Sequence, residues 1–262
     1  MRKICSILFL LLLLTACSDR KKSETGYLEP AISKEQLFVN YLYSLRGKSY
    51  DAYADSLRSW FRRYQRDTAM LAVVEKYLYD PNSPYRNEEL YLPFVHELVQ
   101  SEYTADSLRE AYAYDENMCS LNRVNTQAAD FEFETLQGKR ETLYKINGKY
   151  TLLIFNNPGC EACKEVIELL SRNDRIYKAV LEDSLAVVNV YIDDDIALWK
   201  KSAKEYPSRW HSGFDPNHVI RTDCRYNVRA IPSLYILDEK KKVIMKDAPV
   251  EKVNYFLTNA LN

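Results

Sequence analysis

The feature that most constrains the fold is a pair of cysteines between a strand-like run and a helix-like segment. The motif Cys-Glu-Ala-Cys, with its thiols at Cys160 and Cys163, follows the apolar run Thr151–Phe155. That run has the length of a buried strand. From Lys164 to Ser171 the apolar residues recur at helical spacing. We therefore expect the chain to pass from a strand through the cysteines directly into a helix, as in layered α/β folds.

This position gives the two thiols a chemistry. The thiolate is the reactive form of cysteine, and the dipole and free N–H groups at a helix N-terminus stabilise that anion. Two intervening residues let the second sulfur reach the first within one turn. Cys160 would then attack a substrate disulfide, and Cys163 would resolve the mixed disulfide. Lys164 in place of a histidine argues against covalent haem attachment.

Two other uses of the pair stay open at this point, a structural disulfide and half of a zinc site. A structural zinc site needs four ligands, and the sequence has no second cysteine pair or histidine pair at ligand spacing. We therefore expect neither a metal nor a cofactor.

Residues 122–262 alternate between strand and helix patterns. Besides the strand and helix around the cysteines, a helix is expected near Cys224. The pattern also predicts four strands and a closing amphipathic helix, at Phe131–Glu134, Ala186–Ile192, Ser233–Leu237, Lys242–Met245 and Val250–Leu261. This order predicts a mixed sheet flanked by helices.

A second diagnostic feature is Ile231-Pro232, where a proline opens an apolar strand. Such a proline points to a cis peptide bond. The succession of strand, Cys-x-x-Cys, helix, Ile-Pro, strand and hairpin resembles thioredoxin over about residues 121–262. The preamble Ala129–Lys139 and the Cys-Glu-Ala-Cys pair resemble the TlpA-like branch, the membrane-tethered thiol–disulfide oxidoreductases of bacterial envelopes.

The resemblance implies a thioredoxin-like fold and a role for each motif residue. Cys160 would be the nucleophile and Cys163 the resolving cysteine of the redox-active centre. Ile231 and Pro232 would form the loop that docks the substrate backbone. Protein thiols and disulfides would be the substrates. Reduction is favoured over oxidation because Ile231 before the proline matches thioredoxin.

Three positions depart from the family pattern. Thioredoxin keeps a buried acid six residues before its first cysteine, where this chain has Ile154. Some TlpA-like reductases keep a glutamate three residues after the second cysteine, where this chain has Val166. Ala162 replaces the proline common between the cysteines. Neither usual proton relay is in place, and Glu165 and Glu168 lie on a different helical bearing.

Residues 30–121 have a helical pattern and no catalytic constellation. In Thr68–Tyr79 the apolar residues form one face, with Asp67 as a suitable N-cap. The segment Asp80–Pro84 ends that helix, and further helices are expected near Asn87 and over Thr104–Tyr114. This half resembles the N-terminal domain that precedes such modules in some envelope lipoproteins.

The first 29 residues have the features of a targeting segment. Two basic residues and an apolar run of roughly a dozen residues are typical of a signal peptide, and the run is too short to span a bilayer. It ends in Leu14-Thr15-Ala16-Cys17, the bacterial lipobox pattern. We expect a signal peptide over 1–16, lipidation of Cys17, and a polar tether over 17–29. An ordinary secretory signal with a chance cysteine is the alternative.

A lipobox would place the protein in the cell envelope, anchored to a membrane by lipid, with the thioredoxin-like domain in the periplasm. The formal net charge is −1, with 36 basic and 37 acidic residues. These charges are interspersed, which excludes a nucleic-acid surface. The sequence does not indicate an oligomeric state, the redox partner, or the role of the helical half.

In addition to the motif pair, the mature chain is expected to contain two further cysteines, Cys119 and Cys224. In an oxidising compartment they either form a second disulfide or stay apart. A bridge needs Cα atoms within about 7 Å, and nothing in the sequence brings them together. The prediction is therefore two unpaired, shielded thiols that act as small apolar residues.

The remaining candidates are weaker. The run Asp193–Asp195 is expected to be a solvated loop rather than a cation site. His218 joining the cysteines in a copper site is a minor alternative. His96 and His211 have no partner that the sequence identifies. The three tryptophans are expected in cores, and these are Trp60, Trp199 and Trp210.

The leading hypothesis is a membrane-anchored periplasmic thiol–disulfide oxidoreductase. Its rival is a non-enzymatic partner-binding lipoprotein in which the cysteine pair is a structural disulfide. Solvent access separates the two hypotheses. A catalyst must expose Cys160 and shield Cys163, whereas a structural disulfide would be buried at both ends.

Overall fold

The computed structural model describes residues 32–261. The predicted signal peptide, the lipidation of Cys17 and the tether lie outside these residues. Within 32–261, no helix has both the length and the apolar character needed to cross a bilayer.

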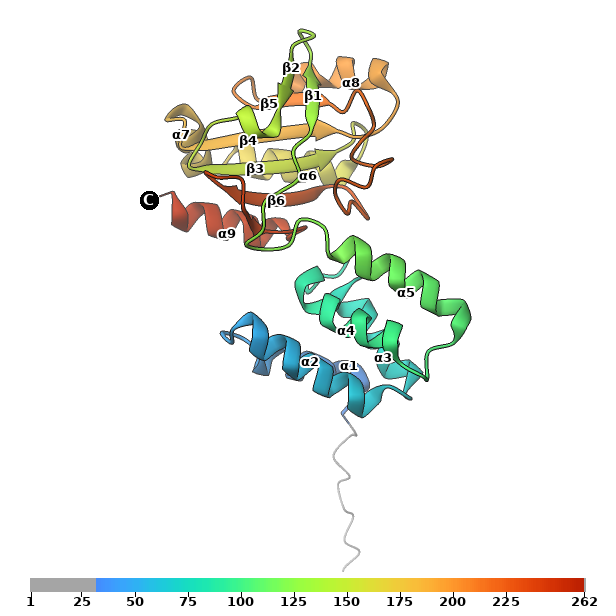
Figure 1. The fold of residues 1–262 in the computed structure, drawn as a ribbon. Coiled ribbons are helices and arrows are strands. Elements are labelled where there is room, and N and C mark those ends of the chain that lie inside the picture. Colours follow the sequence, from blue (N-terminus) through green and yellow to red (C-terminus); the bar gives the residue numbers. More distant parts are fainter. Residues whose placement is uncertain (1–31, 262) are drawn as a thin grey trace, which may run out of the picture. The chain divides into compact units, whose positions relative to one another are not determined.

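The first half of the described chain is entirely helical, as predicted (Figure 1). Its five helices are α1 (Lys34–Ser44), α2 (Tyr50–Tyr64), α3 (Thr68–Leu78), α4 (Glu88–Gln100) and α5 (Asp106–Cys119).

Side-chain caps fix where three of these helices begin. The Asp67 carboxylate accepts from the Met70 N–H at 3.1 Å, as the sequence predicts, and the Asn87 amide oxygen accepts from the Leu90 N–H at 3.1 Å. The Ser49 hydroxyl caps α2 in the same way. Each cap satisfies an N–H group that has no partner within its helix, and is worth roughly 1 kcal/mol.

Pro93 lies inside α4. Proline is tolerated in the first turn of a helix, but Pro93 is the sixth residue of α4 and is buried. It lacks the N–H that would bond to the carbonyl of Glu89. The helix continues past Pro93, and its buried residues also include Tyr91 and Phe94, which are fully buried in the core of this domain.

Aromatic rings stack on one another in and around the core of the helical domain. The ring of Tyr41 stacks on Trp60 with centroids 4.1 Å apart, and Tyr79 stacks on Tyr91 at 4.4 Å. Such pairs add about 0.5–1.5 kcal/mol beyond the burial of their area. The high tyrosine content of this half therefore serves packing in large part.

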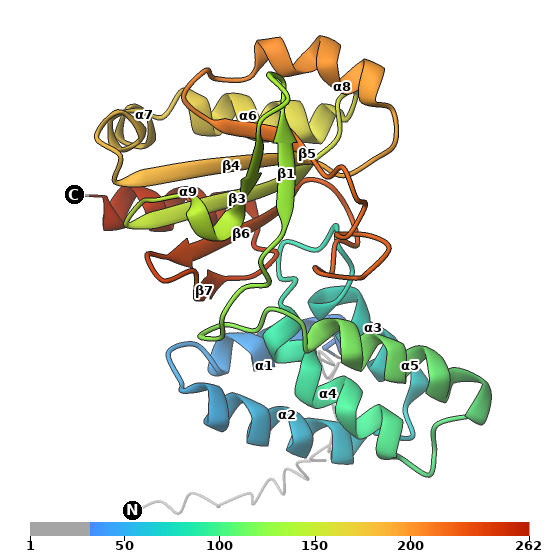
Figure 2. The ribbon, with the colours of Figure 1, turned by 45° about the horizontal axis from the view of Figure 1, so that its top comes forward.

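The second half forms a seven-stranded mixed sheet in the order β2-β1-β5-β4-β3-β6-β7 (Figure 2). The central pairs β3–β4 and β4–β5 are parallel, and the others are antiparallel. The strands are β1 (Glu132–Thr135), β2 (Arg140–Thr142), β3 (Tyr150–Asn156), β4 (Leu185–Tyr191), β5 (His211–Phe214), β6 (Ser233–Asp238) and β7 (Val243–Met245).

Helices cover one face of this sheet, and connecting segments cover the other. Helices α6, α7 and α9 pack on the face that carries Leu152 and Ile154. The opposite face, which carries Leu153 and Phe155, packs against Phe131 and the loop segment around Tyr226. The helices are α6 (Glu161–Ser171), α7 (Asp174–Leu181), α8 (Ile196–Ser202) and α9 (Val250–Ala260), with 3-10 turns at Leu143–Lys145 and Ala203–Glu205.

The helix expected near Cys224 is absent from the described chain, so that prediction is wrong. Residues 217–230 form an irregular loop of turns, and Cys224 itself has a φ of 48°. A left-handed backbone at a non-glycine residue is incompatible with an α-helix. The segment instead buries Ile220 and Tyr226 beneath the sheet.

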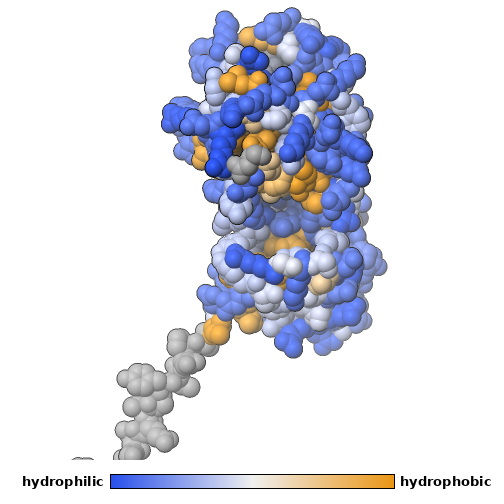
Figure 3. Space-filling view, turned by 90° about the vertical axis from the view of Figure 1, so that its left-hand side faces the viewer, coloured by the Kyte–Doolittle hydropathy of each residue, from blue (hydrophilic) through white to orange (hydrophobic). Residues whose placement is uncertain are grey.

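The surface is mainly polar. The face drawn in Figure 3 is largely hydrophilic, and its hydrophobic atoms fall in separate patches. Most charged side chains therefore stay in water, as is usual. Glu88, Lys246 and Asp247 are buried, and such charges must find partners inside the protein.

Candidate active site

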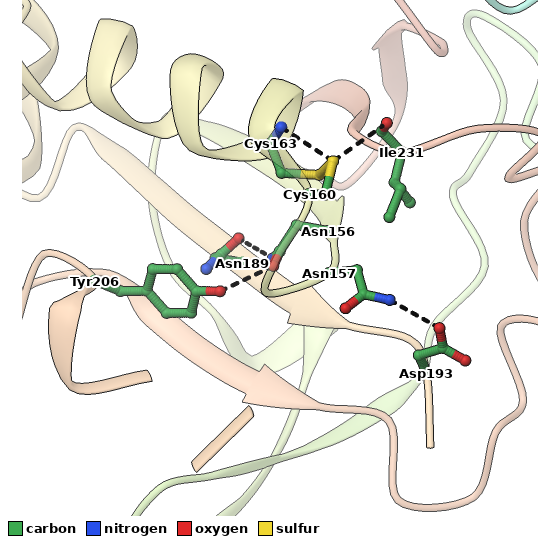
Figure 4. The surroundings of a disulfide bond; sticks show 8 residues. All are labelled: Asn156, Asn157, Cys160, Cys163, Asn189, Asp193, Tyr206 and Ile231. Atoms are coloured by element: carbon green, nitrogen blue, oxygen red, sulfur yellow. Dashed lines mark hydrogen bonds between the residues drawn. A yellow bond between two sulfur atoms is a disulfide. The ribbon is translucent and has the colours of Figure 1, made fainter. Parts of the chain in front are cut away.

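The two cysteines lie at the start of α6, as predicted (Figure 4). They form a disulfide with their Cα atoms 5.2 Å apart. Cys160 is the N-cap of the helix, and its Sγ accepts from the Cys163 N–H at 3.2 Å. The helix therefore presents a free N–H group and the positive end of its dipole to this sulfur.

The two sulfur-bearing residues differ in exposure. Cys160 is half-buried, whereas Cys163 is 2% exposed. A reagent can reach the first residue but not the second.

The Ile231–Pro232 peptide bond is cis, which confirms the prediction from the sequence. The Ile231 carbonyl oxygen lies 3.8 Å from Cys160 Sγ (Figure 4). The structure thus brings together all four predicted site residues, Cys160, Cys163, Ile231 and Pro232, over a sequence separation of 71 residues.

A buried polar chain lies near the disulfide, and the sequence analysis missed it. The Tyr206 hydroxyl donates to Asn156 Oδ1 at 3.0 Å, and Asn156 Nδ2 donates to Asn189 Oδ1 (Figure 4). Burial raises the pKa of Tyr206 to about 12. Asn156 ends β3 and Asn189 interrupts the apolar run of β4, so two buried amides in predicted strands were the available signal.

Two of the positions that depart from the family pattern, Ile154 and Val166, are apolar and buried. Ile154 is fully buried and Val166 is 9% exposed. Glu165 is exposed, and Glu168 pairs with Arg172 at 2.9 Å. These positions agree with the predicted helical bearings, and neither carboxylate is part of the polar chain near the cysteines.

In a comparison with known proteins, the two halves match two different family models. Residues 124–246 match the model of the AhpC/TSA family, and residues 21–122 match a domain of unknown function, DUF5106. A crystal structure of a thioredoxin-like protein from Bacteroides caccae is 32% identical, with a TM-score of 0.81. The match covers 90% of this chain and 87% of that one. The chain belongs to the thioredoxin-like proteins.

Two further relatives of this thioredoxin-like protein match about half of its length. The C-terminal domain of an uncharacterized protein from Bacteroides fragilis is 39% identical, with a TM-score of 0.51, covering 52% of this chain and 98% of that one. The thioredoxin-like protein YneN of Bacillus subtilis is 32% identical over 119 residues. These are 44% of this chain and 65% of YneN.

The residues that the sequence analysis weighed as metal ligands, the aspartate run and His218, take part in caps, hydrogen bonds and ion pairs. Asp195 caps α8, and Asp193 accepts from Asn157 Nδ2 at 2.8 Å. His218 pairs with Asp194 at 3.3 Å. Residues 32–261 contain no cluster of three His, Cys, Asp or Glu side chains that could hold a metal ion.

The other two histidines have partners that the sequence analysis did not identify. His96 pairs with Glu116 at 2.6 Å, and His211 pairs with Glu141 at 3.2 Å. Both partners are distant in sequence, at separations of 20 and 70 residues. The tryptophans are all buried, as predicted, and these are Trp60, Trp199 and Trp210.

Two cysteines of residues 32–261 lie outside the motif, and both are unpaired. Cys119 is fully buried, as predicted. Cys224 is only half-buried, so the prediction that both are shielded is wrong for it. The left-handed turn at Cys224 holds it near the surface, where its Sγ lies 3.6 Å from the Arg221 carbonyl.

A buried ionic network joins the helical domain to the loop that carries Pro232. Glu88, at the start of α4, accepts from Asn227 Nδ2 at 2.8 Å and from Arg229 Nε at 3.1 Å. Its other oxygen lies 2.8 Å from Lys246 Nζ. The Glu88 side chain is 1% exposed and the Lys246 side chain 2%.

The same network reaches the residue after Pro232. Asp247 lies 3.2 Å from Arg229 Nη2 and accepts from the Ser233 hydroxyl at 2.8 Å. Arg86, from the helical domain, donates to the Asp247 carbonyl at 3.1 Å. Burial raises the pKa of Asp247, and the nearby arginines oppose that shift.

Proposed function

We propose that the chain is a thiol–disulfide oxidoreductase that exchanges electrons with protein thiols through Cys160 and Cys163. The observation that carries the proposal is the asymmetry of the pair. The accessible sulfur caps a helix and lies beside the Ile231 carbonyl, and the second sulfur is shielded.

In the reducing direction, the Cys160 thiolate attacks one sulfur of a substrate disulfide. The other substrate sulfur leaves as a thiolate and takes up a proton. Cys163 then loses its proton and attacks Cys160 Sγ, which releases the second substrate thiol. The protein ends with the Cys160–Cys163 disulfide, and two electrons have passed to the substrate. A dithiol donor restores the reduced pair by the reverse steps.

The rival role, a structural disulfide in a partner-binding lipoprotein, requires both cysteines to be buried. The half-buried state of Cys160 favours the catalytic role. In the proposal, reduction is the favoured direction because Ile231 precedes the proline as in thioredoxin.

The redox potential of the purified pair tests the direction. The protein is equilibrated with glutathione buffers of known ratio, and the dithiol fraction is measured by alkylation and mass spectrometry. A potential near −270 mV is typical of a thioredoxin-type reductant, and one near −120 mV of an oxidant. A pair that stays oxidised below about −300 mV is a structural disulfide, and it would refute the proposal.

We further propose that the protein is a lipoprotein anchored at Cys17, with its thioredoxin-like domain in the periplasm. The lipobox pattern supports this placement. Cys17→Ala should move the protein from the membrane to the soluble fraction after cell breakage. Cys224→Ala is the matched control and should stay with the membrane. A Cys17→Ala variant that still sediments with membranes contradicts the anchor.

A further inference from the structure

A groove beside the disulfide is built from both halves of the chain. It has a volume of about 310 Å³. The thioredoxin-like half supplies Ala162, between the cysteines, together with Ile231 and Pro232. The helical half supplies the segment between α3 and α4, with Asn82 and Arg86 among the lining residues. Neither cysteine lines the groove itself, which adjoins the disulfide through Ala162 and through Ile231, whose carbonyl oxygen lies 3.8 Å from Cys160 Sγ. The helical half thus contributes a wall to a groove that adjoins the active site.

The ionic network fixes this wall against the Pro232 loop. Arg86 belongs to the wall segment and donates to the Asp247 carbonyl, and the Asp247 carboxylate accepts from the Ser233 hydroxyl. Glu88, two residues after Arg86, accepts from Arg229 Nε. In the sequence, Arg229 precedes Ile231 and Pro232, and Ser233 follows them. Charge-assisted hydrogen bonds in buried surroundings are strong and directional. The wall and the loop are therefore held as one unit.

The groove combines an apolar floor with acidic side chains. Val166, Pro232 and Pro249 supply apolar surface. Glu165 and Glu251 also line the groove and are exposed. Among residues 32–261, neither carboxylate has a cationic nitrogen within 4.0 Å, whereas the charge of Arg86 is offset by Asp247. The groove therefore favours a cation on whatever it binds.

We propose that this groove binds an extended, cysteine-containing segment of a substrate protein, and that the helical domain determines which segments fit. The segment places an apolar side chain on the floor and a Lys or Arg side chain near Glu165 and Glu251. This inference rests on the proposed thiol–disulfide exchange and names the substrate class of the same site.

Two synthetic peptides test the charge preference. They share one intramolecular disulfide and an apolar residue, and differ only by Lys or Glu beside it. Single-turnover reduction by the reduced protein is followed by chromatography of the peptide. The Lys peptide should react about fivefold faster, an effect in the range of exposed ion pairs. In the Glu165→Gln/Glu251→Gln double variant the ratio should fall toward one. A ratio of one in the wild type overturns the charge preference.

A substitution in the helical domain tests the wall. Asn82 is exposed, so Asn82→Trp can fill the groove without disturbing a core. The variant should reduce both peptides at least tenfold more slowly, relative to its rate with the small neutral 2-hydroxyethyl disulfide. Asn40→Trp, at an exposed position of α1 outside the groove, is the matched control and should retain the wild-type peptide rates.

The outcomes distinguish substrate selection by the helical domain from the exchange activity itself. If Asn82→Trp behaves like Asn40→Trp, the helical domain has no part in substrate choice, although the exchange activity stands. If the wild type fails to reduce even 2-hydroxyethyl disulfide, the exchange activity itself is refuted, and the groove proposal with it.

Discussion

Two helices of the molecule carry a cysteine at one end, and the two ends treat the sulfur in opposite ways. Cys160, a half-buried residue, caps the N-terminus of α6, where the Cys163 N–H donates to its sulfur. Cys119 is the last residue of α5 and is fully buried. Burial raises the pKa of the Cys119 thiol, and the nearby Glu88 carboxylate adds to the effect.

The polarity of the two helix ends matches this difference. An anion is stabilised at a helix N-terminus and a cation at a C-terminus. At the end of α5 the charged group is indeed a cation, because Lys246 Nζ donates to the Cys119 carbonyl at 2.7 Å and also to the Leu121 carbonyl. The comparison teaches that the environment of a thiol, rather than its presence, decides whether it can act.

The largest expected effect is on disulfide exchange. Cys160→Ser should abolish reduction of a protein disulfide, because it removes the attacking sulfur. Cys163→Ser should accumulate mixed disulfides with substrates, visible on non-reducing gels. Cys119→Ala, from the other helix end, should keep the rate within about twofold, since a buried thiol of raised pKa provides little thiolate. A Cys160→Ser variant with full activity would end the assignment.

The next effect concerns the buried ionic network around Glu88, to which Lys246 at the end of α5 belongs. Glu88→Ala leaves Arg229 and Lys246 buried without their carboxylate, so the free energy of unfolding should fall by about 3–5 kcal/mol. Urea denaturation followed by circular dichroism measures it. Asp55→Ala breaks the exposed Asp55–Arg58 pair and should cost at most about 0.5 kcal/mol. Equal losses for the two variants would contradict the role of burial.

A smaller effect should appear at high pH. The Cys119 thiol has an ordinary pKa of 9.0 in the unfolded chain and a raised pKa in the folded protein. Above pH 9 the unfolded chain releases a proton that the folded protein keeps, so this group lowers stability by about 1.4 kcal/mol per pH unit. Cys119→Ala should lose that part of the slope when unfolding is measured between pH 8 and 10 under reducing conditions.

The control for the pH experiment is Cys224→Ala, which removes the other cysteine outside the motif and leaves Cys119 in place. If Cys119→Ala has the same slope as Cys224→Ala, the thiol of Cys119 ionises at an ordinary pH in the folded protein. The contrast between the two helix ends would then fail.

The smallest expected effect is at Cys224. Cys224→Asn should change the free energy of unfolding by no more than about 0.5 kcal/mol, since asparagine tolerates the left-handed backbone. Thiol titration of the Cys160→Ser/Cys163→Ser chain, denatured without reductant, should count Cys119 and Cys224 as free. A count of zero would reveal a disulfide between them.

Local patterns in the sequence were sufficient for the central elements. The strand before Cys160, the helix after it and the cis bond before Pro232 follow from spacing and from the restricted backbone of proline. Strands β2 and β5 were missed, because Arg140–Thr142 and His211–Phe214 have no strand-like apolar pattern, whereas the equally short β1 and β7 do. Strands without that pattern are defined by their pairing partners rather than by an alternation of their own.

The parts of the site that escaped prediction depend on distant contacts. Glu88 and Arg229 are 141 residues apart, and Asn156 and Tyr206 are 50 apart. Nothing local distinguishes Glu88 from the neighbouring Glu89, which pairs instead with Arg123. Charged residues are usually solvated, so sequence reasoning assigns them to the surface until the fold brings their partners close.

The buried network also limits how the two halves can be recombined. The helical half brings Arg86 and Glu88, while the sheet half brings Arg229, Lys246 and Asp247. In a chimera that joins the helical half of one relative to the sheet half of another, the two sets of charged residues come from different proteins. The halves can be exchanged only if each buried charge finds its partner of opposite charge on the other half. A missing partner leaves a buried charge unpaired, which destabilises the fold.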